Sequence, residues 1–170
     1  DRDQRLGQPV PDRLERADVT AELDAGRRAL GWWLVGAGRA MLALARRHAL
    51  DRVQFGRHIS SFQAIRHRLA ETLVAIQGAE ATLHVATHSD DHDGLASLLA
   101  KAAAGQAALT AARHCQQVLG GVGFTAEHAL HHHVKRSLTL DGLLGNTREL
   151  TRDAGKALVD RGFAPRLAEL

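Results

Sequence analysis

Apolar residues recur along the first fifty positions with the period of an α-helix. Their spacings are mostly three, four and seven residues, which places one apolar stripe along a single helical face. The members of this stripe are Leu23, Leu30, Leu34, Ala37, Met41 and Leu44. The pattern predicts a helix over Val19–Leu50, with Thr20 as its N-cap.

The same periodicity predicts four further helices. A second apolar face predicts a helix over Ser61–Ser89, and its members are Ile65, Leu69, Leu73, Ile76 and Ala79. Glycine and polar clusters separate the segments that follow. The helices predicted there are Leu95–Leu119, Ala126–Leu144 and Thr147–Arg161. Long helices joined by short turns predict an all-α fold, an antiparallel up-down four-helix bundle with an additional C-terminal helix.

Composition agrees with a helical fold. Apolar residues make up 45% of the 170 positions, and the chain has no tyrosine and only four phenylalanines. Most apolar residues are alanine or leucine, which favour helices over strands. We divide the chain into residues 1–18, an N-terminal arm or remnant of a preceding domain, and residues 19–170, the helical bundle.

Charge, cysteine content and apolar run lengths exclude several classes of protein. The net charge of +3 is too small for a nucleic-acid signature. Cys115 is the lone cysteine, so the chain forms no internal disulfide, as is typical of a reducing cytoplasm. The longest apolar run, Ala29–Gly38, is too short to cross a bilayer. We therefore expect a cytoplasmic protein with neither a membrane nor a nucleic-acid partner.

The segment after the first predicted helix combines positive charge with a turn. Arg52 and Arg57 place two guanidinium groups beside the start of the second predicted helix, and Gly56 supplies a turn. Guanidinium groups and a helix N-terminus both bind phosphate. Phe55 is suited to stacking on a planar ring, and Gln63 to hydrogen bonding with polar ligand edges. This segment is a candidate dinucleotide or phosphate site; the alternative is a plain connection with solvated arginines and a core phenylalanine.

A glycine-rich loop follows the third predicted helix. Gly120, Gly121 and Gly123 end that helix. Their spacing differs from the dinucleotide-binding fingerprint, and they follow a helix, whereas the fingerprint follows a strand. Two interpretations remain open, a helix cap and a backbone that approaches a ligand closely.

Taken together, these two segments resemble the C-terminal helical domain of the acyl-CoA dehydrogenase family. The first motif matches at Arg52, Gln54, Phe55, Gly56, Ile59, Phe62 and Gln63. The second matches at Gln117, Gly120, Gly121, Gly123, Phe124 and Glu127. The order of the motifs and their separation also match, and the resemblance covers about Val19–Arg161.

The resemblance implies FAD as cofactor, bound where two subunits meet. It implies that Arg52, Gln54 and Phe55 contact the FAD of a neighbouring subunit near its pyrophosphate. It further implies that Gln63, Gln117 and Gly121 touch the adenosine portion, and that Gly120 also belongs to the cofactor-binding residues. On the first predicted helix it implies acyl-CoA contacts for Asp24 and Arg27. Arg27 falls within the apolar stripe, so we expect its side chain to be at least partly buried.

The chain departs from the family at the catalytic base. Family enzymes abstract the α-proton of the thioester with a glutamate, and the two positions for that glutamate match Leu144 and Gly26. Neither residue moves a proton. Asp141, one helical turn before Leu144, is the weak candidate for a displaced base, and the catalytic residue is otherwise unknown.

Three functional hypotheses follow. The first is an FAD-dependent acyl-CoA dehydrogenase that acts on CH–CH groups of an acyl-CoA, with this chain supplying the bundle, the FAD contacts and the oligomer interface. Family enzymes are about twice this length, so another domain or another acyl-CoA dehydrogenase-like subunit supplies the rest. The second is a non-catalytic structural subunit of a heteromer, as in actinobacterial steroid-degrading members of the family. The third is a basic helical interaction module.

Four histidines, His128 and His131–His133, lie on one predicted helix. His128 and His132 have the spacing of two zinc ligands on one helical face, but the neighbouring sequence supplies no cysteine or suitable carboxylate to complete a set. We expect no metal site there. Cys115 has no activating neighbour in the sequence and is expected to be a small core residue.

Overall fold

The structure, a computed structural model, describes residues 13–88 and 94–162. It contains five α-helices: α1 (Arg13–Asp51), α2 (Gln63–His88), α3 (Leu95–Leu119), α4 (Leu130–Gly142) and α5 (Thr147–Arg161). A hairpin of two short strands, β1 (Val53–Gln54) and β2 (Arg57–His58), joins α1 to the 3₁₀ turn η1 (Ile59–Ser61). A second 3₁₀ turn, η2 (Gly120–Phe124), follows α3.

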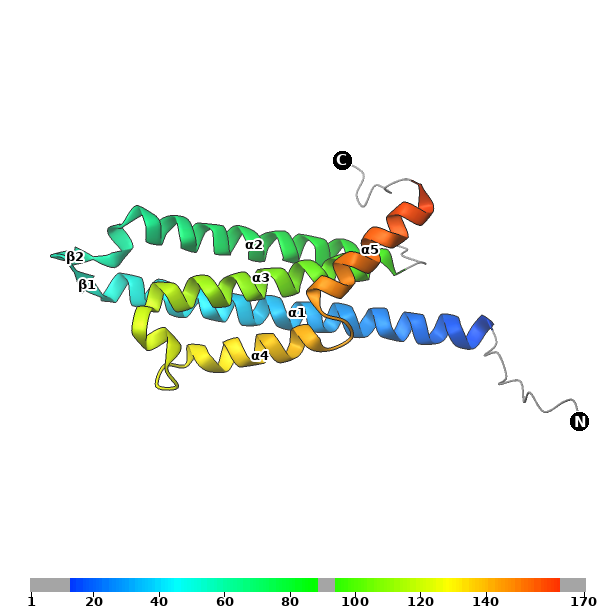
Figure 1. The fold of residues 1–170 in the computed structure, drawn as a ribbon, viewed down its shortest axis with the longest axis horizontal. Helices are drawn as coiled ribbons and strands as arrows, with labels where there is room; N and C mark the ends of the chain where they lie inside the picture. Colours follow the sequence, from blue (N-terminus) through cyan, green and yellow to red (C-terminus); the bar gives the residue numbers. More distant parts are fainter. Residues whose placement is uncertain (1–12, 89–93, 163–170) are drawn as a thin grey trace, which may run out of the picture.

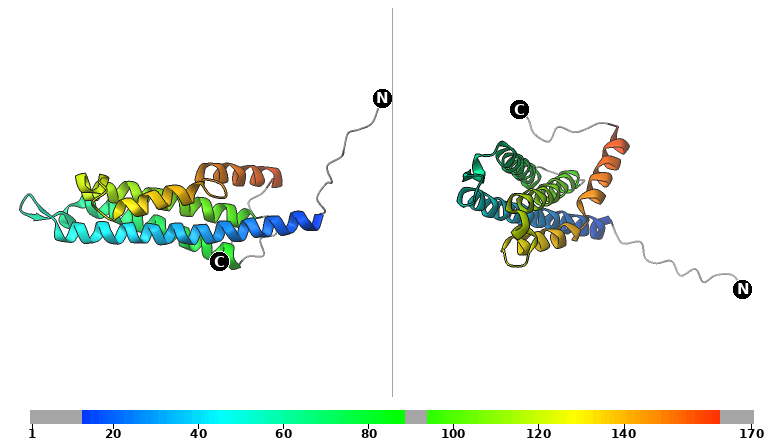
Figure 2. Two further views of the ribbon diagram at one scale, coloured as in Figure 1. Left: turned by 90° about the horizontal axis from the view of Figure 1, so that it is seen from below. Right: turned by 60° about the vertical axis from the view of Figure 1, so that its left-hand side comes forward.

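The first four helices alternate in direction along one long axis (Figure 1). Helix α3 is central, since it packs against α1, α2, α4 and α5. Helix α5 leaves the bundle axis at the end opposite the hairpin (Figures 1 and 2). The predicted up-down four-helix bundle with an additional C-terminal helix is therefore confirmed.

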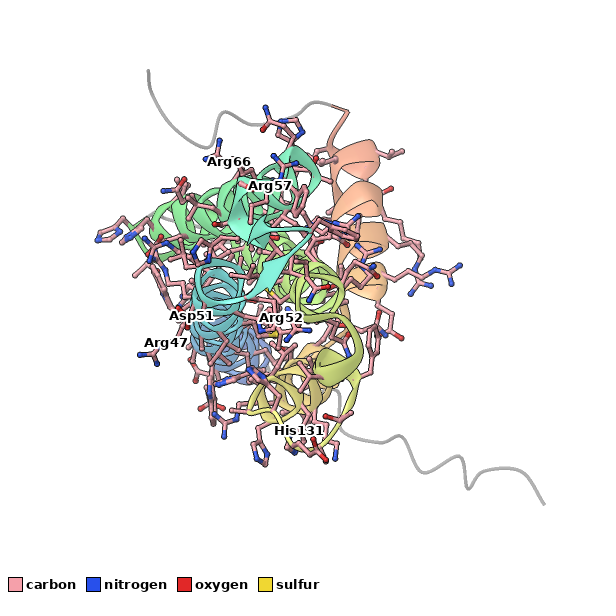
Figure 3. All side chains as sticks on the ribbon, turned by 90° about the vertical axis from the view of Figure 1, so that its left-hand side faces the viewer. Arg47, Asp51, Arg52, Arg57, Arg66 and His131 are labelled. Carbon is pink, nitrogen blue, oxygen red and sulfur yellow. The ribbon has the colours of Figure 1, made fainter. Side chains whose placement is uncertain are left out.

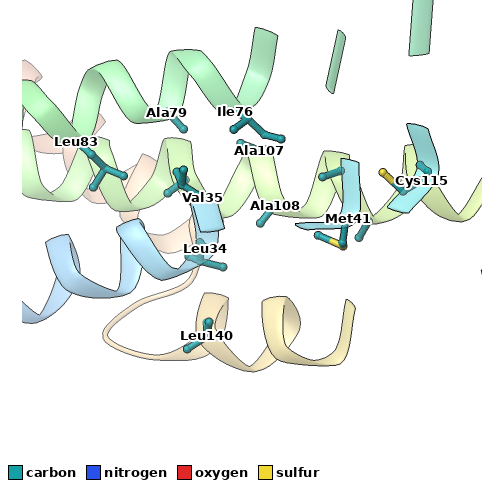
Figure 4. Packing of buried hydrophobic residues seen from close by; sticks show 14 of the residues in the cluster. Leu34, Val35, Met41, Ile76, Ala79, Leu83, Ala107, Ala108, Cys115 and Leu140 are labelled. Carbon is teal, nitrogen blue, oxygen red and sulfur yellow. The ribbon is translucent and has the colours of Figure 1, made fainter. Parts of the chain in front are cut away.

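The core is built mainly of alanine and leucine, largely from α1, α2 and α3 (Figure 4). Leu34, Met41, Ile76 and Leu83 are fully buried. The facing side of α3 is mostly alanine, whose small side chain lets α1 and α2 approach closely. Cys115 is fully buried among these residues, which confirms its expected place in the core.

The starts of two helices, α1 and α4, lie four or more residues from their predicted positions. Helix α1 begins at Arg13, so Thr20 lies inside the helix and the predicted N-cap at Thr20 is wrong. No proline or glycine interrupts residues 13–18, which explains why the helix extends backwards through them. Helix α4 begins at Leu130, where the His128 Nδ1 atom accepts the Leu130 N–H at 3.1 Å. The sequence also failed to predict the β1–β2 hairpin.

Among the described residues, one stretch is long and apolar enough to span a membrane by length and composition. It covers Leu95–Phe124, and most of it is buried against the other helices. The central helix of a bundle meets the same criteria because it is apolar on nearly every side.

Candidate functional site

The β1–β2 hairpin presents Phe55 at the tip of a strained turn. Val53 pairs with His58 and Gln54 with Arg57, so Phe55 and Gly56 form a two-residue loop. Their φ angles are +53° and +75°, which is the pattern of a type I′ turn. Glycine adopts this conformation freely, whereas a phenylalanine in the left-handed region costs about 1–2 kcal/mol. The side chain of Phe55 is nevertheless 90% exposed, so its burial does not offset this cost.

Aromatic and cationic contacts brace the hairpin. The Phe55 and Phe62 rings meet edge to face, with centroids 6.2 Å apart. The Arg57 guanidinium lies 4.3 Å from the centroid of the Phe62 ring. The Ile59 N–H donates to the Arg52 carbonyl oxygen at 2.9 Å and so closes the base of the hairpin. The 90% exposure of Phe55 refutes the alternative in which this residue fills the core.

The end of the bundle that carries the hairpin is rich in cations. Figure 3 looks onto this end, with Arg57 and Arg66 above Arg52, and Arg47 to one side. Among the described residues, neither Arg52 nor Arg57 forms an ion pair with a carboxylate. These guanidinium groups are available to an anion.

His48 adds a partly buried titratable group to this end. Burial lowers the pKa of His48, Arg52 and His128 lower it further, and Asp51 acts against them. His128 follows the glycine loop along the chain, and His48 precedes the hairpin. The effect of His128 on the pKa of His48 therefore shows that these two parts of the chain are close enough to interact electrostatically. The histidine patterns in the sequence did not identify His48; its position one turn before Arg52 was the available signal.

The glycine loop lies at the same end of the bundle as the hairpin (Figures 1 and 2). Helix α3 ends at Leu119, and Gly120 follows with a φ of +65°, its N–H donating to the carbonyls of Gln116 and Gln117. A Cβ on Gly123 would lie 2.7 Å from the Gln116 carbonyl oxygen. Gly120 is therefore needed for its backbone angle and Gly123 for close packing, which confirms the predicted helix cap.

Gly121 has no such explanation within the described chain. Its φ is not positive, it is exposed, and a Cβ there would meet nothing within 4 Å. Gln63 and Gln117 are also exposed. The structure thus brings all seven expected cofactor-binding positions to one end of the bundle, and each of them is exposed except Gly120, which is half-buried: Arg52, Gln54, Phe55, Gln63, Gln117, Gly120 and Gly121.

The two residues expected at the acyl-CoA lie away from the hairpin end, on α1. The Asp24 carboxylate is buried, and the Arg27 guanidinium donates to it at 3.1 Å. Asp24 also lies against Gly94 at the start of α3, where a negative charge is favourable for the helix dipole. The Arg27 side chain is 21% exposed, which confirms the expected partial burial.

The two family positions for the catalytic glutamate lie in contact. A Cβ on Gly26 would lie 2.7 Å from the Leu144 Cδ1 atom, so the leucine side chain covers the glycine. The Arg27 Nε atom donates to the Leu144 carbonyl oxygen at 3.2 Å. The structure therefore puts an apolar contact where the family resemblance places a carboxylate.

Asp141, the weak candidate for a displaced base, is engaged with the start of α5. Its Oδ1 atom accepts hydrogen bonds from the Thr147 hydroxyl at 2.5 Å and from the Thr147 N–H at 3.2 Å. It also lines a hollow with residues of α3, of α5 and of the turn before α5: Gln106, Leu109, Asn146, Thr147, Arg148, Thr151 and Arg152.

The histidine-rich segment on α4 gathers no metal-ligand set. Within residues 13–88 and 94–162, no group of three or more histidine, cysteine, aspartate or glutamate side chains is placed to hold a metal ion. The His131 and His132 rings lie with their centroids 3.8 Å apart and their planes tilted by 39°. Burial, together with Arg136 and His132, lowers the pKa of His133.

Known proteins similar to this chain agree on one family. A model of the acyl-CoA dehydrogenase C-terminal domain matches residues 17–158. Over 118 residues, the chain is 40% identical to the acyl-CoA dehydrogenase IpdE2 of Mycobacterium tuberculosis, covering 69% of this chain and 36% of that protein. It is 36% identical over 138 residues to IpdE2 of Mycolicibacterium smegmatis, covering 80% of this chain and 41% of that protein.

Solved structures give the same result. The fold matches a steroid acyl-CoA dehydrogenase, Tcur3481–Tcur3483, with a TM-score of 0.82 and 26% identity, over 86% of this chain and 41% of that chain. It matches the ChsE4–ChsE5 complex from Mycobacterium tuberculosis with a TM-score of 0.75 and 26% identity, over 85% and 39%. The chain thus spans about two fifths of each of these four proteins or chains. It belongs to the acyl-CoA dehydrogenase family and corresponds to the C-terminal helical domain of that family.

Proposed function

We propose that the protein to which this chain belongs is an FAD-dependent acyl-CoA dehydrogenase that introduces an α,β double bond into an acyl-CoA thioester. The chain supplies the C-terminal bundle, the cofactor contacts at the hairpin end and part of an oligomer interface. The observation that carries the proposal is Phe55, held exposed in a strained turn beside unpaired guanidinium groups. Strain of this kind persists where function uses it.

The hairpin end fits the charged and aromatic parts of FAD. Arg52 offers a guanidinium to the pyrophosphate, and Phe55 and Gln54 project beside it from the hairpin. The open space above Gly121 admits a ligand against the backbone, next to the amide of Gln117. When bound, FAD supplies the acceptor for the hydride that leaves the β-carbon of the acyl group.

A residue that projects outward contacts a neighbouring subunit more readily than its own chain. The exposure of Phe55 and Arg52 therefore favours FAD bound between this chain and a second subunit of the same family. Acyl-CoA would lie beyond the hairpin end along α1, near Asp24 and Arg27. The Asp24 carboxylate is buried in an ion pair, so the partly exposed Arg27 is the more accessible of the two. We place the protein in the cytoplasm.

A second candidate function is a non-catalytic subunit of a heteromeric acyl-CoA dehydrogenase. It is favoured by the contact of Leu144 with Gly26, which leaves no carboxylate at either expected base position. Asp141 would have to break the two hydrogen bonds that it accepts from Thr147 before it could take a proton from a substrate. In this role the chain completes the FAD site of a catalytic partner and leaves proton abstraction to that partner.

Purification and assay of the full-length protein test both functions. A flavin absorbance near 450 nm, released FAD and dehydrogenation of an acyl-CoA by a homomer would support the first function and refute the second. Stable co-purification with a homologous subunit, with activity only in the complex, would support the second. A protein that is colourless both alone and in complex with a homologous subunit would refute both functions. Salt-sensitive DNA binding by that colourless protein would support the basic interaction module instead.

A further inference from the structure

Lys101 is a fully buried lysine on the central helix α3. It is the largest side chain with no exposed surface among the described residues. Its Nζ atom donates to the carbonyl oxygen of Asp141 at 3.1 Å and to that of Gly145 at 3.2 Å. Burial lowers the pKa of Lys101, while Asp141 acts to raise it and Arg27 to lower it. The Asp141 carbonyl lies in the last turn of α4, and the Gly145 carbonyl lies in the connection between α4 and α5.

That connection has an unfavourable backbone conformation. Leu144 has a φ of +56° and Gly145 a φ of +100°. The left-handed region is unfavourable for a leucine, so the segment requires external contacts to stay in place. Arg27 on α1 supplies one of them, since its Nε atom donates to the Leu144 carbonyl oxygen. Two cations from two helices thus bind three main-chain carbonyls within five residues.

We infer that Lys101 is a positioning residue, which holds the α4–α5 connection so that the Leu144 side chain lies over Gly26. The ammonium group is suited to this task because it has three donors in a compact head. A guanidinium is a wider, planar group and would need more room beneath the connection. Methionine has a similar length and packs as well, but donates no hydrogen bond.

The choice of lysine is informative because a buried cation is costly. Even a complete buried ion pair often stabilises a protein no more than apolar residues of the same volume, and Lys101 is buried with main-chain carbonyls as its acceptors. If Lys101 served packing alone, methionine would be the better residue. A lysine at this position is explained when the position of the connection matters more than the stability of the bundle. The consequence for the acyl site rests on the proposed function: the connection then forms a fixed apolar wall beside Arg27.

The wild-type chain permits a direct test, because it contains only three lysines. Lys135 and Lys156 are exposed, so their ammonium protons exchange rapidly with water. In a ¹⁵N-lysine-labelled chain at neutral pH, we expect one slowly exchanging ammonium signal, close to the α-protons of residues 141 and 145. The absence of a protected ammonium would overturn the inference, and this measurement requires no variant.

The Lys101→Met variant tests positioning against packing. The reporters are amide hydrogen exchange at Thr147, which donates to Asp141, and at Leu143, which donates to the Leu140 carbonyl. We expect exchange at both to accelerate about tenfold, as for the loss of one or two charged hydrogen bonds. Exchange at Ile76, in the core of α2, should change far less.

Two further variants complete the experiment. Lys135→Met, on the exposed side of α4, is the matched control and should leave all three amides unchanged. Arg27→Met removes one contact to the same connection. It should accelerate amide exchange at Leu143 and Thr147 less than Lys101→Met does. Uniform acceleration that includes Ile76, or no acceleration at Thr147 and Leu143, would overturn the inference. None of these measurements uses flavin, so failure here is distinct from failure of the proposed function.

Discussion

Replacing Phe55 separates the conformational cost of the hairpin tip from the contact that its ring makes with a ligand. We compare Phe55→Ala with Phe55→Asn. Both variants lose the ring, which is 90% exposed and therefore contributes little by burial. Only asparagine tolerates a φ of +53°, and it is a preferred residue at the first central position of a type I′ turn.

The difference between the two variants measures the backbone cost. We expect Phe55→Asn to be more stable than Phe55→Ala by about 1 kcal/mol, or roughly 2–4 °C in Tm for a chain of this size. Urea unfolding followed by circular dichroism measures it. Equal stability would show that the turn is not left-handed at residue 55 and would refute the strain argument.

The same pair measures the ring's contribution to the cofactor. In the full-length protein with its partner, both variants should bind FAD roughly 2- to 10-fold more weakly than wild type, the range expected for one aromatic contact. Their affinities should be equal to one another, because both lack the ring. Unchanged affinity in both would show that Phe55 serves the hairpin and does not contact the flavin nucleotide.

Three further predictions concern the core, acid stability and the glycine loop. Burial raises the pKa of Cys115 from 9.0 to about 12, so above pH 9 the unfolded thiol loses a proton that the folded one keeps. The free energy of unfolding should therefore fall by about 1.4 kcal/mol per pH unit between pH 9 and pH 12. In urea unfolding, Cys115→Ala should remove this dependence. The lowered pKa values of His48 and His133 mean that the unfolded chain takes up protons first as pH falls below 6.5. Stability should therefore decrease in that range, and an acid titration with His48→Gln and His133→Gln should show a shallower decrease. Gly123→Ala should destabilise the protein by about 1–3 kcal/mol because the new Cβ meets the Gln116 carbonyl. Gly121→Ala should change the free energy of unfolding by less than about 0.5 kcal/mol but should weaken FAD binding. Equal stability of the two glycine variants would contradict the loop geometry.

The sequence predicted the helices well because their signal is periodic and long. The stripe from Leu30 to Met41 is the core face of α1, and the glycines after Leu119 end α3 where expected. The start of α1 was misplaced because residues 13–18 are charged and lack an apolar stripe, although they contain nothing that stops a helix. Charge alone does not end a helix.

The candidate sites were less accessible to sequence reasoning. The motifs indicated which residues gather at the hairpin end, but the left-handed turn at Phe55 was not predicted, since phenylalanine rarely adopts it. Gly26 and Leu144 are in contact although they are 118 positions apart in the sequence, and no local sequence pattern predicts a contact between such distant positions. Lys101 was missed, although it is the lone charged residue within the apolar stretch of α3 from Leu95 to Ala112. A charge on the buried face of a helix was the available signal.

The central claim is that the exposed hairpin end of this bundle binds FAD through Arg52. The most direct measurement is FAD bound per chain, from flavin absorbance and released nucleotide, in the full-length protein purified with its partner. Arg52→Met is compared with Arg47→Met, which removes an exposed arginine five residues earlier at the same end. We expect the Arg52 variant to lose most of its FAD while the Arg47 variant retains wild-type occupancy. Full occupancy in the Arg52 variant, or equal loss in both variants, would contradict the account.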